Sequence, residues 1–245
     1  MTDIEKLKKA IEDSNKIVVF SGAGLSTNSG IPDFRSADGI YNEKLNSMFS
    51  PEEIISHSFF LKYPKEFYDF YFSKMVYKDA KPNSGHIFFK ELEKLGKDVT
   101  IVTQNIDGLH SLAGSKKVIE VHGTILKNYC MKCHKFYSLD DILSKKPVPY
   151  CDCGGIIKPD VVLYEESLNE KDIYGAINSI EEADMLIVVG TSLVVYPAAS
   201  FVRYYRGNKL VLLNKSATPY DSSCDIVIHD DIKNIVEELK GAKIF

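Results

Sequence analysis

The 245-residue sequence has no tryptophan and only three arginines, Arg35, Arg203 and Arg206, against 27 lysines. It also has no apolar run that approaches the length of roughly 18 residues that a membrane-spanning helix needs. The net charge is −4, and the isoelectric point is about 5.9. This charge argues against a protein whose main task is to bind nucleic-acid phosphates. We therefore expect no membrane association and no direct nucleic-acid binding.

The sequence also lacks a signal peptide and an even set of cysteines. Its N-terminus opens on a charged amphipathic pattern, with Asp3, Glu5 and Lys6. Four of the five cysteines lie within 24 residues, and Cys224 stands alone. An odd, clustered set without a secretion signal predicts a metal site in a reducing compartment and not a disulfide framework. We therefore expect a cytoplasmic protein.

The clustered cysteines form two close pairs, Cys130-x2-Cys133 and Cys151-x-Cys153, which 17 residues separate. Four thiolates on two turns can close a tetrahedral zinc site, although the second pair is tighter than the usual spacing. Four sulfur ligands leave no open position for water, so such a zinc ion is structural and not catalytic. A disulfide or incidental thiols are the alternatives.

The order of apolar segments predicts an α/β fold with a doubly wound parallel sheet. Short runs rich in valine and isoleucine alternate with helical patterns, as expected when helices cover both faces of a parallel sheet. The expected strands are 16–20, 99–102, 118–121, 185–189, 210–213 and 226–228. The expected helices span 4–11, 82–95, 169–183, 197–205 and 231–239.

Two stretches interrupt this alternation. Residues 36–85 show no strand pattern but hold ten aromatic residues between Phe49 and Tyr77, and residues 125–159 hold the clustered cysteines. Neither stretch has the composition of a linker. We expect them to form a smaller inserted domain, a helical module and a zinc module, against a larger domain made of 1–35, 86–124 and 160–245.

A glycine-rich turn follows the first expected strand, with the sequence Gly22-Ala23-Gly24-Leu25-Ser26. Glycines at a strand-to-helix turn let the backbone approach a pyrophosphate, although Thr27 stands where a third glycine is usual. Arg35 follows within the next ten residues, in a chain that otherwise favours lysine. Its bidentate geometry suits a phosphate, and a surface ion pair is the alternative.

Polar or glycine-rich residues also follow four other expected strands. The carboxyl ends of parallel strands lie at the edge where doubly wound sheets bind ligands. Five such strand ends predict one site. Because His122 follows one of these strands, we interpret it as a site residue and not as an ordinary structural histidine. The residues after the four strands are Gln104, Asn105, Ile106 and Asp107; His122; Gly190, Thr191 and Ser192; and Asn214.

Taken together, these motifs resemble the sirtuins, NAD-dependent protein lysine deacylases, of the bacterial type. The resemblance covers nearly the whole chain, and its motifs occur in the family's order: the glycine-rich turn, Gly30-Ile31-Pro32-Asp33-Phe34-Arg35, Thr103-Gln104-Asn105-Ile106-Asp107, His122-Gly123, the four cysteines and Gly190-Thr191-Ser192. It implies a Rossmann-like NAD domain and a small domain with one structural zinc ion.

The resemblance also implies roles for individual residues. Asn105 and Asp107 would position nicotinamide, Phe34 would shield the reacting ribose, and His122 would be the general base. Gln104 would contact the nicotinamide ribose, Ser192 a phosphate, and Asn214 the adenine ribose. The implied NAD-binding residues are Gly22, Ala23, Gly24, Ser26, Thr27, Asp33, Phe34, Arg35, Gln104, Asn105, Ile106, Asp107, Gly190, Thr191, Ser192, Asn214, Asp231 and Ile232, with Asn105 and His122 as the catalytic pair.

The implied reaction transfers the acyl group of acetyl-lysine to ADP-ribose, with release of nicotinamide. The acyl-lysine protein would bind as an extended strand between Val161, Val162, Leu163 and Tyr164 on one side and Leu193, Val194 and Val195 on the other. Tyr164-Glu165-Glu166 departs from the family's frequent Phe-Gly-Glu. The alternatives are protein mono-ADP-ribosylation with NAD and, in another class, a non-catalytic NAD sensor or zinc-ribbon nucleic-acid binder.

The resemblance extends to the acyl group. Sirtuins that prefer succinyl-lysine carry a Tyr-x-x-Arg pair; here Tyr68 matches the tyrosine and Tyr71 stands in place of the arginine. We expect these two residues to line a hydrophobic acyl tunnel, with acetyl removed far faster than succinyl.

Overall fold

The computed structural model describes residues 1–34, 39–42 and 48–242. Its largest element is a six-stranded sheet in which every neighbouring pair is parallel. The order β3-β2-β1-β7-β8-β9 is that of a Rossmann-like doubly wound sheet once the strands of a second sheet are left out. This confirms the predicted fold class. The strands are β1 (Lys16–Ser21), β2 (Asp98–Thr103), β3 (Lys117–Glu120), β7 (Met185–Val189), β8 (Leu210–Leu213) and β9 (Ile226–Ile228).

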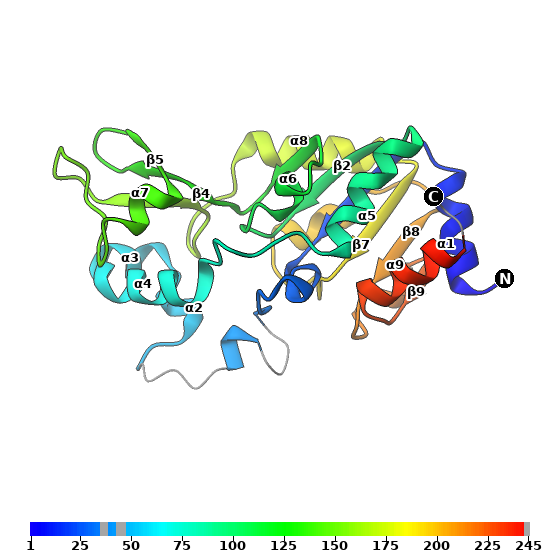
Figure 1. Cartoon of the computed structure of the whole chain (residues 1–245), viewed down its shortest axis with the longest axis horizontal. Coiled ribbons are helices and arrows are strands. Elements are labelled where there is room, and N and C mark those ends of the chain that lie inside the picture. The colour runs from blue at the N-terminus through cyan, green and yellow to red at the C-terminus, as the bar shows by residue number, and fades with distance from the viewer. Residues whose placement is uncertain (35–38, 43–47, 243–245) are drawn as a thin grey trace.

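Helices cover both faces of this sheet (Figure 1). On one face, α1 (Asp3–Glu12), α5 (Ser84–Leu92) and α9 (Ile232–Gly241) share a core with the inward side chains of the strands. On the other, α8 (Glu170–Glu181) packs with a 3-10 helix, Ala198–Tyr204. This 3-10 helix stands where a regular helical pattern was predicted. A 3-10 turn at Glu93–Leu95 extends α5, and α6 (Leu109–Leu112) follows β2.

A three-stranded antiparallel sheet forms the other end of the molecule (Figure 1). It contains β4 (Gly123–Cys130), β5 (Phe136–Ser138) and β6 (Ile157–Val161) in the order β5-β4-β6, and α7 (Leu139–Leu143) packs on it. The sequence analysis did not predict these strands. The register of β4 against β6 shifts between Thr124 and Asn128, so its buried positions do not alternate regularly.

Short helices from the aromatic stretch pack against this small sheet. They are a 3-10 turn at Ile40–Asn42, α2 (Pro51–Ile54), α3 (His57–Lys62), α4 (Pro64–Phe70) and a π-helical turn at Tyr71–Met75. One cluster of buried side chains joins them to the sheet, with Phe60, Phe67 and Ile157 fully buried at its centre. In the part of the chain that the structure describes, no helix has both the length and the apolar character to cross a membrane.

Candidate active site

Two glycine turns meet at the centre of the parallel sheet, where β1 and β7 are neighbours. The turn after β1 runs through two 3-10 turns, Ala23–Leu25 and Thr27–Ser29. A side chain on Gly22 would lie 2.6 Å from Cβ of Thr191, and one on Gly190 would lie 2.3 Å from the Leu25 amide nitrogen. Gly190 also has a φ of +61°, which favours glycine. The two turns therefore pack closely only because both are glycine-rich.

A cavity of about 1010 Å³ opens beside these turns. Its volume is at the upper end of the usual range for ligand pockets, and it lies where doubly wound sheets bind dinucleotides. It extends to the small sheet, because Val161 and Leu163 also line it. One cavity thus joins the ends of the parallel strands to β6.

A hydrogen-bond network forms the cavity wall between the turn after β1 and the loop after β2. Asn105 Nδ2 donates to Gly22 O at 3.0 Å and to Ser26 Oγ at 3.1 Å. The Ser26 hydroxyl donates to Asp107 Oδ2 at 2.6 Å. Burial raises the pKa of the Asp107 carboxyl, although the bonds from Ser26 and from the Leu109 amide oppose that shift. The network holds the Asn105 amide and the Asp107 carboxyl in fixed orientations at the cavity.

His122 lines the same cavity, in the short link between β3 and β4. Its Nδ1 is 3.0 Å from the main-chain oxygen of Gln104. A carbonyl oxygen only accepts, so Nδ1 carries the proton and Nε2 of the neutral ring keeps its lone pair. Burial lowers the pKa of His122, and the bond to Gln104 raises it by a smaller amount. A neutral imidazole with a free acceptor nitrogen can act as a general base.

Gln104 ties the loop after β2 to the turn after β7, because its Nε2 donates to Thr191 Oγ1 at 3.1 Å. Most of the predicted site residues thus converge on one cavity. Those that line it are Gly22, Ala23, Gly24, Ser26, Thr27, Asp33, Phe34, Gln104, Asn105, Ile106, Asp107, His122, Val161, Val162, Leu163, Tyr164, Gly190, Thr191, Ser192, Val195, Asn214 and Ile232.

Some predicted residues lie elsewhere. Asp231 does not line the cavity: it caps α9 and pairs with Lys215 at 2.8 Å, while its neighbours Asp230 and Ile232 form the wall. Leu193 is buried below the loop, with a positive φ of 56°, and Val194 points to solvent. Arg35 lies outside the described residues.

Tyr68 and Tyr71 also lie away from the cavity wall. Both are fully buried in the aromatic cluster of the small sheet, where Tyr71 stacks on Phe67 and the Tyr68 hydroxyl donates to Ile157 O. The helix carrying them turns these positions inward, so they do not form the expected acyl tunnel in this structure. Lys74 and Met75, one turn further along the chain, line the cavity instead.

Several other residues line the cavity but were not predicted from the sequence. Ile55 and Tyr77 come from the aromatic stretch, where no period separated buried from cavity-facing positions. Lys215 and Ser216 directly follow Asn214, so the end of β8 was a signal that could have found them. Glu165 and Tyr196 directly follow the predicted substrate segments 161–164 and 193–195, so the ends of those segments were a signal that could have found them.

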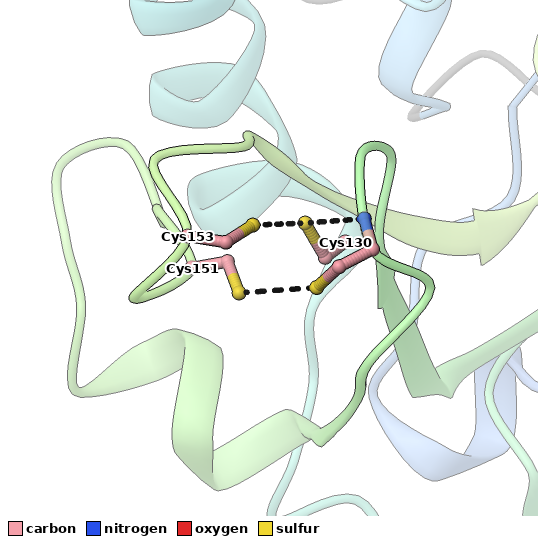
Figure 2. A group of neighbouring side chains, drawn as sticks. Cys130, Cys151 and Cys153 are labelled. Atoms are coloured by element: carbon pink, nitrogen blue, oxygen red, sulfur yellow. Dashed lines mark hydrogen bonds between the residues drawn. The ribbon is translucent and has the colours of Figure 1, made fainter.

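The four cysteines come together at the tip of the small sheet (Figure 2). Their sulfur atoms all lie within 4.8 Å of one another, and Cys130–Cys153 and Cys133–Cys151 are 3.5 Å apart. Zinc–sulfur bonds of about 2.3 Å in a tetrahedron place sulfur atoms about 3.8 Å apart. The cluster therefore fits a structural zinc ion.

A neighbouring hydroxyl supports the thiolate form that zinc requires. Tyr137 OH donates to Cys151 Sγ at 3.0 Å. This bond is the main reason that the pKa of the Cys151 thiol falls to about 6. A hydrogen bond to the charged form favours that form.

Comparison with known proteins agrees with this geometry. The Sir2 family model matches residues 22–197. An NAD-dependent protein deacetylase of Clostridium perfringens is 59% identical over 95% of this chain and 96% of its own length. One from Clostridium tetani is 58% identical, over 96% of this chain and 98% of its own.

Solved structures also resemble the chain in their fold. A Sir2 structure with deacetylated p53 peptide and 3'-O-acetyl-ADP-ribose has a TM-score of 0.90 and 35% identity, over 99% of both chains. A Sir2 structure with p53 peptide and NAD+ has a TM-score of 0.86 and 36% identity, over 98% of both. Because the family model covers both glycine turns and most of the cavity wall, and these relatives align along nearly the whole chain, this protein belongs to the Sir2 family.

Proposed function

We propose that this protein is an NAD-dependent protein lysine deacetylase. It transfers the acetyl group of acetyl-lysine to ADP-ribose, so that acetyl-lysine, NAD and one water molecule yield lysine, nicotinamide and 2'-O-acetyl-ADP-ribose. One observation carries this proposal. His122, the glycine turns of the parallel sheet and the end of strand β6 all line one cavity. Relatives at 58–59% identity have the same activity in their names.

The glycine turns and the loop after β2 would hold NAD. The close approach of the turns at Gly22 and Gly190 leaves the backbone open to a pyrophosphate. Asn105 and Asp107 would orient nicotinamide through the amide and carboxyl groups that Ser26 fixes. Asn214, Lys215 and Ser216 line the opposite end of the cavity and would meet the adenosine.

His122 would act as the general base. In this reaction the acyl oxygen of acetyl-lysine replaces nicotinamide on the ribose, and a ribose hydroxyl then attacks the acyl carbon. The neutral imidazole takes the hydroxyl proton on Nε2 while its Nδ1–H stays on Gln104 O. Phe34 lies in the cavity wall, packed on Tyr41 at 5.4 Å between ring centroids, and would keep water from the reacting carbon.

The acetyl-lysine peptide would bind as an extended strand beside β6. Val161, Val162, Leu163 and Tyr164 line one side of the cavity and Val195 the other. On the opposite edge, the Tyr164 amide donates to Ile55 O and the His57 amide to Tyr164 O. These bonds fix the segment so that its cavity side can pair with a peptide. The structure of a Sir2 protein bound to acetylated peptide supports this assignment.

The division into domains remains a proposal. We place residues 36–85 and 125–159 in a small domain and 1–35, 86–124 and 160–245 in the NAD domain. The buried cluster around Phe60 and Ile157 supports this division, because its members come from both inserted stretches. The zinc ion would hold the tip of the small domain, far from the reacting atoms.

Mass spectrometry of an acetyl-lysine peptide, with and without NAD, tests the activity. Deacetylation that depends on NAD, with stoichiometric acetyl-ADP-ribose, is the expected result. A protein substrate that instead gains the mass of ADP-ribose would establish the alternative, mono-ADP-ribosyl transfer. Both reactions begin with loss of nicotinamide, so only the products separate them.

A further inference from the structure

His229 and Asn214 face each other at the far end of the cavity from His122. Asn214 is the first residue after β8 and His229 the first after β9, and these strands are parallel neighbours (Figure 1). His229 Nδ1 lies 3.0 Å from the main-chain oxygen of Asn214. Asn214 lines the cavity, whereas His229 stands behind it.

The second ring nitrogen of His229 also has an acceptor. Nε2 lies 2.8 Å from Asp221 Oδ2, in the 3-10 turn Asp221–Ser223. The other oxygen of Asp221 accepts from the Thr218 amide and from its hydroxyl, both at 2.8 Å. The carboxylate is thus fixed from one side and meets His229 with the other.

Both partners of His229 are obligate acceptors. A carbonyl oxygen and an ionised carboxylate have no proton to donate, and a neutral imidazole has one N–H. A neutral ring can therefore make one of the two bonds, and the second nitrogen would present its lone pair to an oxygen. Both bonds form together only when the imidazole carries two protons.

We propose that doubly protonated His229 is a positioning residue, which holds Asn214 in the cavity wall for the adenosine end of NAD. This inference rests on the proposed NAD-binding function. Loss of the proton releases one bond and lets the segment from Asn214 to Ser216 relax away from the ligand. NAD affinity should then fall as pH rises through the neutral range.

The charges around His229 agree with this direction. The bonds to Asn214 and Asp221 raise the pKa of His229 above its ordinary value. Asp230, the next residue, accepts from Asn234 and adds a second nearby carboxylate. Lys215, next to Asn214, is paired with Asp231. Since the raised pKa belongs to the bonded form, the bonds are complete below it and are lost above it.

Binding of ADP-ribose, measured by calorimetry at about pH 6 and about pH 9, tests the proposal. ADP-ribose carries the adenosine and the pyrophosphate but undergoes no turnover. We expect affinity to weaken by about two- to fivefold at the higher pH, the size of a half-exposed ion pair. Binding at about pH 8 should also take up protons, visible as an enthalpy that depends on the buffer's ionisation heat.

Two variants remove the titration of His229 but keep its hydrogen bond to Asn214. Asp221→Asn keeps an oxygen for Thr218 and turns an amide toward His229, so a neutral ring can make both bonds. His229→Asn keeps a donor for Asn214 O without titrating. Both should bind ADP-ribose with no pH dependence.

Equal affinity of the wild type at both pH values, or a wild-type slope in both variants, would overturn the role of His229 and leave the deacetylase function intact. If the wild type bound no ADP-ribose at either pH, the proposed NAD-binding function would itself be wrong.

Discussion

His122 Nδ1 lies 3.0 Å from the main-chain oxygen of Gln104, so the backbone of one strand end sets the tautomer of the histidine at the next. This contact leaves Nε2 as the nitrogen that can accept a proton in the cavity. The same residue, Gln104, also reaches Thr191 through its side chain. The position of the base is therefore coupled to the turn that would hold NAD.

Replacement of His122 by alanine should abolish net deacetylation. A general base contributes about 10²- to 10⁴-fold, so kcat/KM for acetyl-lysine peptide should fall by that factor. Exchange of labelled nicotinamide into NAD should persist, because that step does not need the base. Peptide mass spectrometry and the exchange assay together check this. A variant that deacetylates at nearly the wild-type rate would remove His122 from the mechanism.

The pH profile of the wild type should reflect the same group. The base works when neutral, and burial lowers the pKa of His122 from its ordinary value of 6.5. As pH falls through that lowered pKa, the ring becomes protonated and activity is lost. We expect the acid limb of kcat/KM below pH 6.5, with no loss from this group at neutral pH. An acid limb centred above pH 7 would contradict the assignment.

Zinc should be required for the small sheet. Cys151→Ser removes the thiolate that Tyr137 stabilises, so the protein should lose about one zinc ion per chain and the fold around β4 to β6. Cys224→Ser is the matched control, since Cys224 lies outside the cluster and should keep the metal. Metal analysis and proteolysis of both variants check this. A well-folded wild type without zinc would refute it.

The parallel sheet was predictable because its strands are buried on both faces. Runs such as Met185–Val189 are wholly buried and read as continuous apolar segments, which periodicity detects. Strand β4 is different. It is half exposed, and its register shift near Asn128 lies in the pairing with β6, a strand distant in sequence. Such pairing depends on tertiary context and leaves no local pattern.

The residues of the site also differ in how well the sequence predicts them. Residues at strand ends, such as Asn105 and His122, were predictable because parallel strands deliver their carboxyl ends to one edge. The expectation for Tyr71 depended on a helix rotation that the sequence does not fix, since aromatic residues occur on every side of that segment. Lys74 and Met75 of the π-helical turn line the cavity instead.

A buried histidine should make the fold sensitive to mild acid. His86 is fully buried at the start of α5, and burial lowers its pKa from 6.5 to about 4. Between these values the unfolded chain binds a proton that the folded chain does not, so the free energy of unfolding falls as pH drops below 6.5. The shift corresponds to about 3 kcal/mol in total.

Urea unfolding at about pH 7 and about pH 5 tests this. His86→Asn keeps an acceptor for the Asn83 amide, which donates to His86 Nδ1 at 3.3 Å, but does not titrate. The variant should lose about 2 kcal/mol less than the wild type between the two pH values. Equal losses would show that His86 is not protonated on unfolding in this range.

Tyr68 and Tyr71 provide a matched pair for the aromatic cluster. Both are fully buried, but their hydroxyls differ: that of Tyr68 donates to Ile157 O, whereas that of Tyr71 has no hydrogen-bond partner among the residues that the structure describes. A buried hydroxyl without a partner costs about 1–3 kcal/mol. Tyr71→Phe should therefore raise the free energy of unfolding by about 1 kcal/mol, and Tyr68→Phe should lower it by a similar amount.

The same variants decide whether Tyr71 takes part in acyl selection. Because Tyr71 lies in the core and not in the cavity wall, Tyr71→Phe should leave the ratio of kcat/KM for matched acetyl and succinyl peptides unchanged. Chemical unfolding and the two peptide assays can use the same protein samples. A stability gain without a change in the ratio would assign Tyr71 to packing alone. A changed ratio would show that its hydroxyl reaches the acyl group when substrate binds, as expected if Tyr71 takes the place of the arginine of succinyl-selective sirtuins.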